Sequence, residues 1–437
     1  MEKPSFKEAF WFWLKLGFIS FGGPAGQIAI IHEFVVEKKK WISESRFLHA
    51  LNYTMLLPGP EAQQLATYTG WLLHGTRGGL VAGIFFVLPS MFILLGLSIL
   101  YARYGNIPWV YAMFDALKPA VLAIVILALI KIGKKSLHTP FHFLLALSAF
   151  VGMFFFNIPF PYIIIAALMV AFILRRTTPG LFKHTASASA QLDADESSYF
   201  INNQHTTNID NSKITLVKQL LITSLLWVIP LVLFFIISSD FIFWQQLIFF
   251  FTKAAFVTFG GAYAVLPYVA QVSVENLQWL TELQMIDGLA LGETTPGPLV
   301  MVLVFVGFMA GYNHFGGSLL MGSVGLITTT IYTFIPCFLF IFAGAPFIEK
   351  TRENEKIKQA LTLVTAAVVG VILNLTLYLG KAILFSTAVS FSDLNYKTLI
   401  WIIVSFIAMY RFKVNMITWI LITAAVGFGH YWWMTLS

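Results

Sequence analysis

The motifs Phe21-Gly22-Gly23 and Pro58-Gly59-Pro60 interrupt apolar sequence near the start of this chain, and they return as Phe259-Gly260-Gly261 and Pro296-Gly297-Pro298. The offset in numbering between motif and copy is identical in both cases. The same offset relates four further matches: Lys15 to Lys253, Trp41 to Trp279, Glu44 to Glu282, and Gly78-Gly79 to Gly316-Gly317. The repetition predicts two related halves, each with two interrupted hydrophobic segments. Duplicated broken segments of this kind are typical of the binding sites of membrane transporters.

The composition indicates an all-α integral membrane protein with several spans. The 437 residues are 58% hydrophobic and 11% charged, with a mean hydropathy of +0.81. Soluble domains have about 25% charged residues. Several apolar stretches reach the roughly 20 residues that a helix needs to cross a bilayer: Gly78–Tyr101, Val110–Ile130, Leu216–Ser238 and Leu319–Phe342. The polar start of the chain, Met1 to Glu8, has no cleavable signal, so we expect the first apolar segment to remain in the mature protein.

The remaining composition argues against several other classes of protein. The net charge of +7 comes from basic residues clustered in short loops beside apolar spans, which predicts no nucleic-acid binding. Cys337 is the only cysteine, so neither an intramolecular disulfide nor a cysteine-rich metal site is expected. The sequence has no nucleotide-binding loop, zinc motif or catalytic triad at plausible positions, and we expect no cofactor.

Charge distribution predicts that the two halves have inverted topology. We divide the chain into a first repeat (1–174), a hydrophilic, flexible cytoplasmic linker (175–213), one connecting helix (214–240) and a second repeat (241–437). The added helix reverses the orientation of everything after it. No Lys or Arg occurs between Lys253 and Lys350, whereas the matching stretch of the first half has six: Lys38, Lys39, Lys40, Arg46, Arg77 and Arg103. Basic loops stay in the cytoplasm, so this difference fits inverted halves.

The shape of the interrupted segments can be interpreted in two ways. In the first, each break is the turn of a helical hairpin that does not cross the membrane. In the second, each interrupted segment is one kinked span. We prefer hairpins, because kinked spans would put Lys38 to Lys40 outside. The inverted relation of the halves holds in both interpretations.

The breaks themselves are the predicted substrate site. Backbone without hydrogen bonds cannot face lipid, so breaks at membrane depth must be buried in protein or line a wet cavity. The N-terminus of each half-helix that follows a break carries free N–H groups and about half a positive charge, which attracts anions. The break residues expected to surround an anion are Gly22, Gly23, Pro24, Pro58, Gly59, Pro60, Gly260, Gly261, Pro296, Gly297 and Pro298.

Polar residues near the breaks extend this prediction. Asn52, Gln63, Gln64, Thr294 and Thr295 could donate hydrogen bonds to the anion. Lys15 and Lys253 could supply countercharge, or their side chains could instead reach the membrane interface. Acidic residues are costly in apolar zones.

Glu61 and Glu293 suggest proton coupling, because a carboxylate beside an anion opposes binding unless it is protonated. For Glu61 the alternative is a carboxylate that complements the helix dipole.

At these residues the sequence resembles the chromate ion transporter family, in its long form with two fused halves. The resemblance is carried by the blocks Phe18–Ala29, Leu56–Ala66, Gly78–Gly83, Phe256–Pro267 and Gly292–Pro298. It covers roughly residues 6–135 and 245–375. The family implies export of chromate across the bacterial cytoplasmic (inner) membrane, driven by the membrane potential or a proton gradient. It also implies site roles for the break residues, for Lys15, Arg46 and Glu61, and for Gln27, which lies within the first block.

We therefore expect a secondary transporter that exports chromate by alternating access and confers chromate resistance. Its partners would be the lipid bilayer, a chromate-like or sulfate-like dianion and a coupling proton. Three alternatives remain open: transport of sulfate or another oxyanion, an intramembrane enzyme that uses Glu61 and Glu293 as acid and base, and a passive anion channel. The sequence leaves the direction of transport, the stoichiometry and the oligomeric state open, a homodimer included.

Overall fold

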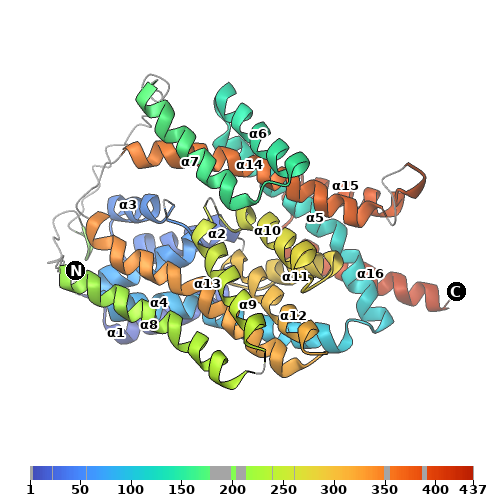
Figure 1. Cartoon of the computed structure of the whole chain (residues 1–437), viewed down its shortest axis with the longest axis horizontal. Helices are drawn as coiled ribbons and strands as arrows, with labels where there is room; N and C mark the ends of the chain where they lie inside the picture. The colour runs from blue at the N-terminus through green and yellow to red at the C-terminus, as the bar shows by residue number, and fades with distance from the viewer. Residues whose placement is uncertain are drawn as a thin grey trace.

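The chain folds into helices joined by short connections in the computed structural model (Figure 1). The structure describes residues 3–21, 23–55, 57–177, 198–202, 213–238, 240–259, 261–348, 355–385 and 391–436. Gly22 and Gly260, and most of the predicted linker, lie outside the described residues. Within the described ranges the only β-structure is two isolated bridges, Ile42 with Ile201 and Phe385 with Leu394. The predicted all-α fold is confirmed.

The first repeat consists of two short broken segments and then longer helices. Its elements are α1 (Phe6–Ile19), α2 (Gly23–His32), the π-helical turn η1 (Glu33–Lys38), α3 (Glu44–Thr54), α4 (Glu61–Tyr104), α5 (Pro108–Ser136), α6 (Pro140–Phe156) and α7 (Phe160–Thr177). Helix α8 (Lys213–Ile237) then connects the halves.

The second repeat follows the same order. Its elements are α9 (Phe241–Val257), α10 (Ala262–Ala270), the π-helical turn η4 (Gln271–Asn276), α11 (Glu282–Thr294), the 3₁₀ turn η5 (Leu299–Met301), α12 (Val302–His314), α13 (Leu319–Ile348), α14 (Glu355–Leu384), the 3₁₀ turn η6 (Phe391–Asp393), α15 (Tyr396–Tyr410) and α16 (Met416–Leu436).

Backbone geometry repeats with the offset found in the sequence. The turn η4 begins and ends at the positions equivalent to the bounds of η1, and α9 ends at the position equivalent to the end of α1. Positive φ angles recur at Lys40 and Gln278 (50° and 49°) and at Gly59 and Gly297 (118° and 89°). Over the broken segments, the two halves are therefore copies of one structural unit.

Each broken segment folds back on itself as a hairpin. Phe12 of α1 stacks near Phe34 of η1 with ring centroids 5.6 Å apart, and Lys39 reaches Glu8 at 2.7 Å. The second segment returns in the same way, since Tyr53 of α3 lies 5.5 Å from Tyr68 of α4. In the second repeat, a side chain at Gly292 of α11 would contact Val302 of α12. These contacts favour the hairpin interpretation over kinked spans.

Helix α4 is two antiparallel helices joined at His74 and Gly75. Both residues have non-helical angles, and Gly75 has φ 61°. Gly70 and Gly78 would lie about 12 Å apart in one straight helix. Here a Cβ at Gly70 would sit 2.5 Å from the carbonyl oxygen of Gly78. The chain therefore reverses at Gly75, just before the apolar stretch predicted to begin at Gly78.

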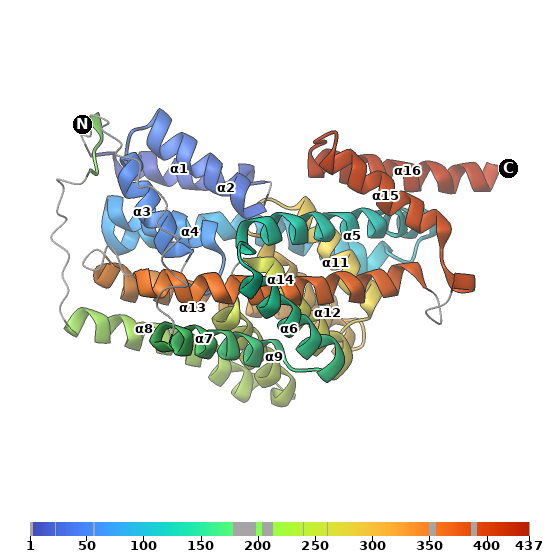
Figure 2. The same cartoon turned by 90° about the horizontal axis from the view of Figure 1, so that it is seen from above.

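The arrangement of the helices is that of a multi-pass membrane protein with inverted halves. Among the described residues, five helical ranges contain a stretch long and apolar enough to span a membrane: Glu61–Tyr104, which reverses at Gly75, Pro108–Ser136, Leu216–Ile237, Leu319–Gly344 and Thr362–Leu384. Helix α3 lies toward the end of the molecule that carries the N-terminus, and α11 and α12 lie toward the end that carries the C-terminus (Figure 2). The equivalent helices α3 and α11 thus lie toward opposite ends of the molecule, as inverted halves require.

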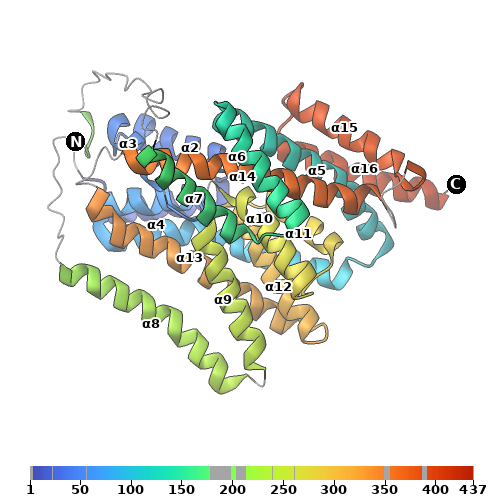
Figure 3. The same ribbon diagram turned by 45° about the horizontal axis from the view of Figure 1, so that its top comes forward.

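Helix α8 borders the molecule and, among the described helices, packs mainly against α9 and α13 (Figure 3). Its connection to the body is specific: the indole of Trp227 donates to Thr252 Oγ1 at 2.9 Å, and Tyr332 donates to the Trp227 carbonyl at 2.6 Å. Its exposed leucine, isoleucine and phenylalanine side chains suit lipid contact. This is the connecting helix that reverses the second half.

Candidate functional site

Each Pro-Gly-Pro break binds the glycine-containing break of the opposite repeat. The Gly59 N–H donates to the Thr258 carbonyl at 2.7 Å, and the Gly297 N–H donates to the Ser20 carbonyl at 2.7 Å. Gly59 corresponds to Gly297 under the repeat offset, and Ser20 corresponds to Thr258, so the two hydrogen bonds are equivalent by symmetry. The described parts of the four breaks therefore meet in two crossed pairs inside the protein.

Glycine is required at both breaks. Besides the positive φ angles, a Cβ at Gly59 would lie 2.8 Å from Cys337 Sγ and 2.8 Å from Gln64 Nε2. A Cβ at Gly297 would collide with the hydroxyl of Ser90, which donates to the Pro296 carbonyl. Ser90 and Cys337 occupy matching places, each directly after a proline in α4 and α13. Each break is thus held by its partner break and by one helix of the opposite repeat.

Three buried glutamines lie at the breaks, and two of them bind the break carbonyl groups. Gln27 Nε2 donates to the Ser20 carbonyl at 3.2 Å and also to the Gly297 carbonyl. Gln64 Nε2 donates to the Pro58 carbonyl at 2.7 Å, and Gln63 Nε2 donates to Thr67 Oγ1 at 3.2 Å. The predicted amide donors are therefore engaged within the protein. The Oε1 atoms of all three are buried without a hydrogen-bond partner in the described part of the chain.

One carboxylate lies directly at the breaks of the second repeat. Glu293, 6% exposed at the end of α11, accepts a hydrogen bond of 2.6 Å from Tyr263 in the first turn of α10. The hydroxyls of Thr294 and Thr295 donate back to Leu291 and Gly292 of their own helix. Glu61 is the first residue of α4 and is partly exposed. The hydrogen bond between Tyr263 and Glu293 thus joins α10 to α11 beside the breaks of the second repeat.

Several predicted residues lie away from the breaks. Lys15 and Lys253 are exposed, and Lys15 Nζ lies 5.9 Å from the centre of the Phe34 ring. This position favours the interfacial interpretation of both lysines over countercharge. Asn52 is also exposed. Arg46 is buried in the first turn of α3, about 12 Å along the helix from Thr54 and its break.

Sequence reasoning missed Ser20, Thr258, Ser90, Cys337 and Tyr263. The repeat offset could have indicated Ser20 and Thr258, because they precede the glycine motifs in both halves.

The two hairpin pairs differ in what covers them. In the second repeat, α10 and α11 pack against α5 and α14. Under the repeat offset α5 corresponds to α14, so symmetry would place α2 against α5, and α3 against both α14 and α5. Among the described residues none of these pairs packs extensively. Instead, a groove of about 530 Å³ opens between α2, η1 and α3, lined by Ala25, Ile28, His32, Phe47 and Leu51 among others. Ile28 and Leu51 in this groove are partly exposed, whereas the corresponding Leu266 and Leu289 are at most 1% exposed. One end is open and its mirror image is closed.

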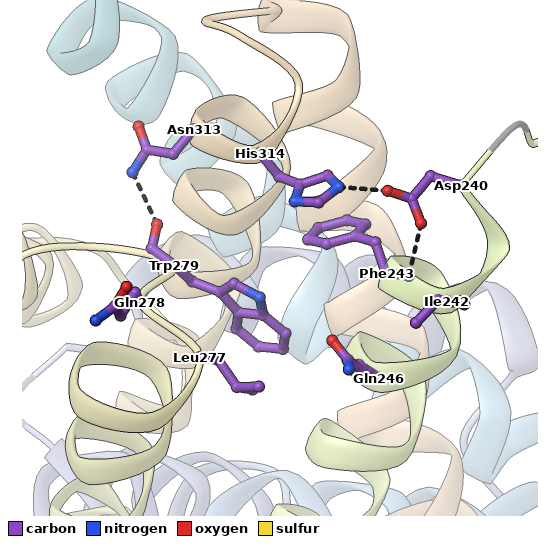
Figure 4. Close-up of a pocket in the computed structure, with 9 residues that line it drawn as sticks. All are labelled: Asp240, Ile242, Phe243, Gln246, Leu277, Gln278, Trp279, Asn313 and His314. Carbon is purple, nitrogen blue, oxygen red and sulfur yellow. Dashed lines mark hydrogen bonds and ion pairs between the residues drawn. The ribbon is translucent and has the colours of Figure 1, made fainter.

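A second pocket, of about 400 Å³, lies at the outer turn of the second repeat (Figure 4). His314 Nε2 lies 2.6 Å from Asp240 Oδ2 beside Phe243 and Trp279. The hydrogen bond from His314 holds the pKa of Asp240 below its usual range. Because these residues belong to the loop ends of the helices, the pocket is separate from the breaks.

Comparison with known proteins gives consistent results. A family model described as chromate transporter matches residues 7–172 and 245–428. An uncharacterized transporter from Methanocaldococcus jannaschii is 28% identical over 98% of this chain and 96% of its own length. The chromate transport protein of Pseudomonas aeruginosa is 30% identical over 84% of this chain and 79% of its own. That of Cupriavidus metallidurans is 27% identical over 85% and 81%. No solved structure matches.

The close approach at Gly59 predicts a measurable coupling between Gly59 and Cys337. We expect Gly59→Ala to lower the free energy of unfolding by about 2 kcal/mol or more, because the new Cβ meets strained backbone and the thiol. Cys337→Ala in the same chain should recover part of this loss. Denaturant titration of the four proteins in detergent measures the coupling.

Gly23→Ala is the matched control, since Gly23 also has positive φ (69°) but no atom within 4 Å of its Cβ position. Equal losses in Gly59→Ala and Gly23→Ala, with no coupling to Cys337, would contradict the packing described for this break.

Proposed function

The chain belongs to the chromate transporter family, and from this premise we propose that it exports chromate by alternating access. The transport would occur across the bacterial cytoplasmic membrane and confer chromate resistance. The observation that carries the proposal is the reciprocal pair of hydrogen bonds from Gly59 and Gly297, which joins the breaks of both repeats. A site made by both repeats can face either side of a membrane when one repeat moves against the other.

The breaks supply the chemistry that a tetrahedral dianion needs. Helices α2, α4 and α10 and the turn η5 all begin at breaks, and the first N–H groups of a helix have no partner within it. Such N-termini attract anions through free donors and the helix dipole. The amides of Gln27 and Gln64 now bind break carbonyls, and a bound oxyanion would compete for the same donors. Sulfate has the same shape and charge, so selectivity depends on details of this site.

Glu293 is the preferred residue for proton coupling, with Glu61 as the second candidate. A carboxylate beside a bound dianion repels it, whereas the protonated acid does not. Glu293 is buried, and Tyr263 is its hydrogen-bond partner. In the first repeat, Met55 is the counterpart of Glu293 and Ala25 is the counterpart of Tyr263, so neither member of this pair has a polar equivalent. Proton coupling through Glu293 and Tyr263 would therefore involve the second repeat and not the first.

Alternating access is supported by the unequal covering of the hairpin pairs. The first repeat has the open groove at the end that the positive-inside rule places in the cytoplasm. At the opposite end, Asp287 of α11 accepts a 2.8 Å hydrogen bond from Tyr101 of α4, which holds the closed side together. If the groove of the first repeat closed and the equivalent surface of the second repeat opened, the site would become accessible from the opposite face of the membrane.

The direct test is chromate flux into proteoliposomes. We expect chromate to cross unchanged, with an initial rate that increases at least threefold under an imposed pH gradient. Sulfate should compete. Glu293→Gln should abolish the response to the pH gradient, because the amide cannot carry the proton, while the exposed Glu282→Gln on the same helix should keep it.

Three results would contradict this proposal. Flux equal to that of protein-free liposomes would exclude chromate transport. Flux that follows only the electrochemical gradient of chromate itself would indicate a passive channel. A chemically altered product would indicate an enzyme.

The groove predicts unequal reactivity at equivalent positions. In a Cys337→Ala background, a cysteine replacing Leu51 in the groove should react with maleimide at least tenfold faster than one replacing Leu289. Reversing the driving gradient should slow the first reaction and accelerate the second. If Leu289→Cys stays unreactive under every gradient that supports transport, alternating access fails.

A further inference from the structure

The segment 198–202, within the predicted linker, lies along the turn between η1 and α3. The N–H groups of Phe200 and Ile201 donate to the carbonyls of Lys40 and Trp41 at 3.2 and 2.9 Å. The Ser43 N–H donates to the Ile201 carbonyl at 2.9 Å, which makes a parallel bridge. Ile201 is 1% exposed and belongs to the same hydrophobic cluster as Trp41. This part of the predicted linker is paired and buried, contrary to a uniformly flexible tether.

The second repeat satisfies two of the equivalent backbone groups with its own side chains. The carbonyl of Trp279, equivalent to Trp41, accepts from Asn313 Nδ2 at 2.8 Å. The N–H of Thr281, equivalent to Ser43, donates to Gln284 Oε1 at 2.9 Å as part of a capping box. No additional segment is needed at this turn.

The first repeat lacks both of these side chains. By the repeat offset, Gly75 is at the position of Asn313, and glycine has no side-chain donor. Arg46 stands where the second repeat has Gln284, and a guanidinium group has no acceptor for the Ser43 N–H. The two missing partners correspond to two of the backbone groups that residues 198–202 bind. The substitutions and the added segment therefore compensate each other.

We infer that residues 198–202 are an added strand that completes the first repeat, with the turn at Lys40–Ser43 as its docking surface. Strand addition takes affinity from main-chain hydrogen bonds and specificity from pockets for single side chains. Here Ile201 fills such a pocket.

The turn also joins η1 to α3, two walls of the open groove. Residues 198–202 thus stabilise the first repeat beside its open groove, and their release from the turn would loosen the wall of the groove.

Hydrogen exchange of the full-length protein in detergent tests this inference without any substrate. Ile201→Asp should raise the exchange rate of the Ser43 amide at least tenfold, because a carboxylate cannot occupy the apolar pocket. The Thr281 amide serves as the internal reference and should not change. Ile201→Val keeps both the N–H group and an apolar side chain, so it should behave like the parent protein. If Ile201→Asp does not fold, Phe200→Pro removes the N–H that donates to Lys40, together with a partly buried ring, and should accelerate exchange in the same place.

A second experiment gives the first repeat a side-chain acceptor that the second repeat has at the equivalent position. Arg46→Gln, added to Ile201→Asp, should restore protection of the Ser43 amide, because glutamine can accept from this N–H as Gln284 accepts from the N–H of Thr281. The inference is overturned if Ile201→Asp and Phe200→Pro both leave the Ser43 amide protected, or if Arg46→Gln restores nothing. Transport assays of the same variants would rest on the proposed function. The exchange experiment does not, so the two ideas fail separately.

Discussion

Two equivalent hydrogen bonds, from Gly59 to Thr258 and from Gly297 to Ser20, hold the interior of this protein together. They join helix ends that would otherwise leave backbone groups without partners at membrane depth, where each such group costs several kcal/mol. Because each bond crosses from one repeat to the other, each repeat depends on the other to pair these backbone groups.

This constraint also explains how symmetry and asymmetry coexist in the molecule. The breaks, the π-helical turns and the positive φ angles follow the repeat closely. The polar groups around them do not: Glu293 with Tyr263, and Asp287 with Tyr101, belong to one side only. A symmetric frame permits two equivalent arrangements, and one-sided charges can make their energies depend on protons or substrate. The open groove at one end and the buried equivalent surface at the other fit such a frame.

Much of this fold follows from short motifs whose physical effect is local. The glycine and proline motifs end α1, α3, α9 and α11 wherever they occur, and Gly75 reverses α4 near the expected boundary. The candidate site is less predictable, because its contacts join residues far apart in the sequence. Ser90 binds Pro296, and Gln27 binds Gly297, and no local pattern specifies either pair.

Lys15 shows a different limit of sequence reasoning. Helix α1 is apolar on nearly every face, so periodicity could not show that Trp13 and Leu16 point inward and Lys15 outward. Residues 198–202 were hidden by the polar composition around them. Their role becomes visible only when the turn of one repeat is compared with that of the other.

Inversion of the two repeats with respect to the membrane can be tested directly at their turns. Lys40 and Gln278 are not buried, have matching φ angles of 50° and 49°, and occupy the same turn in each repeat. Single cysteines at these positions, in a Cys337→Ala background, can be labelled in intact cells with a maleimide that does not cross membranes. If the repeats are inverted, Gln278→Cys is labelled from outside, and Lys40→Cys is labelled only after the membrane is permeabilised. Labelling of both from the same side would contradict the inversion.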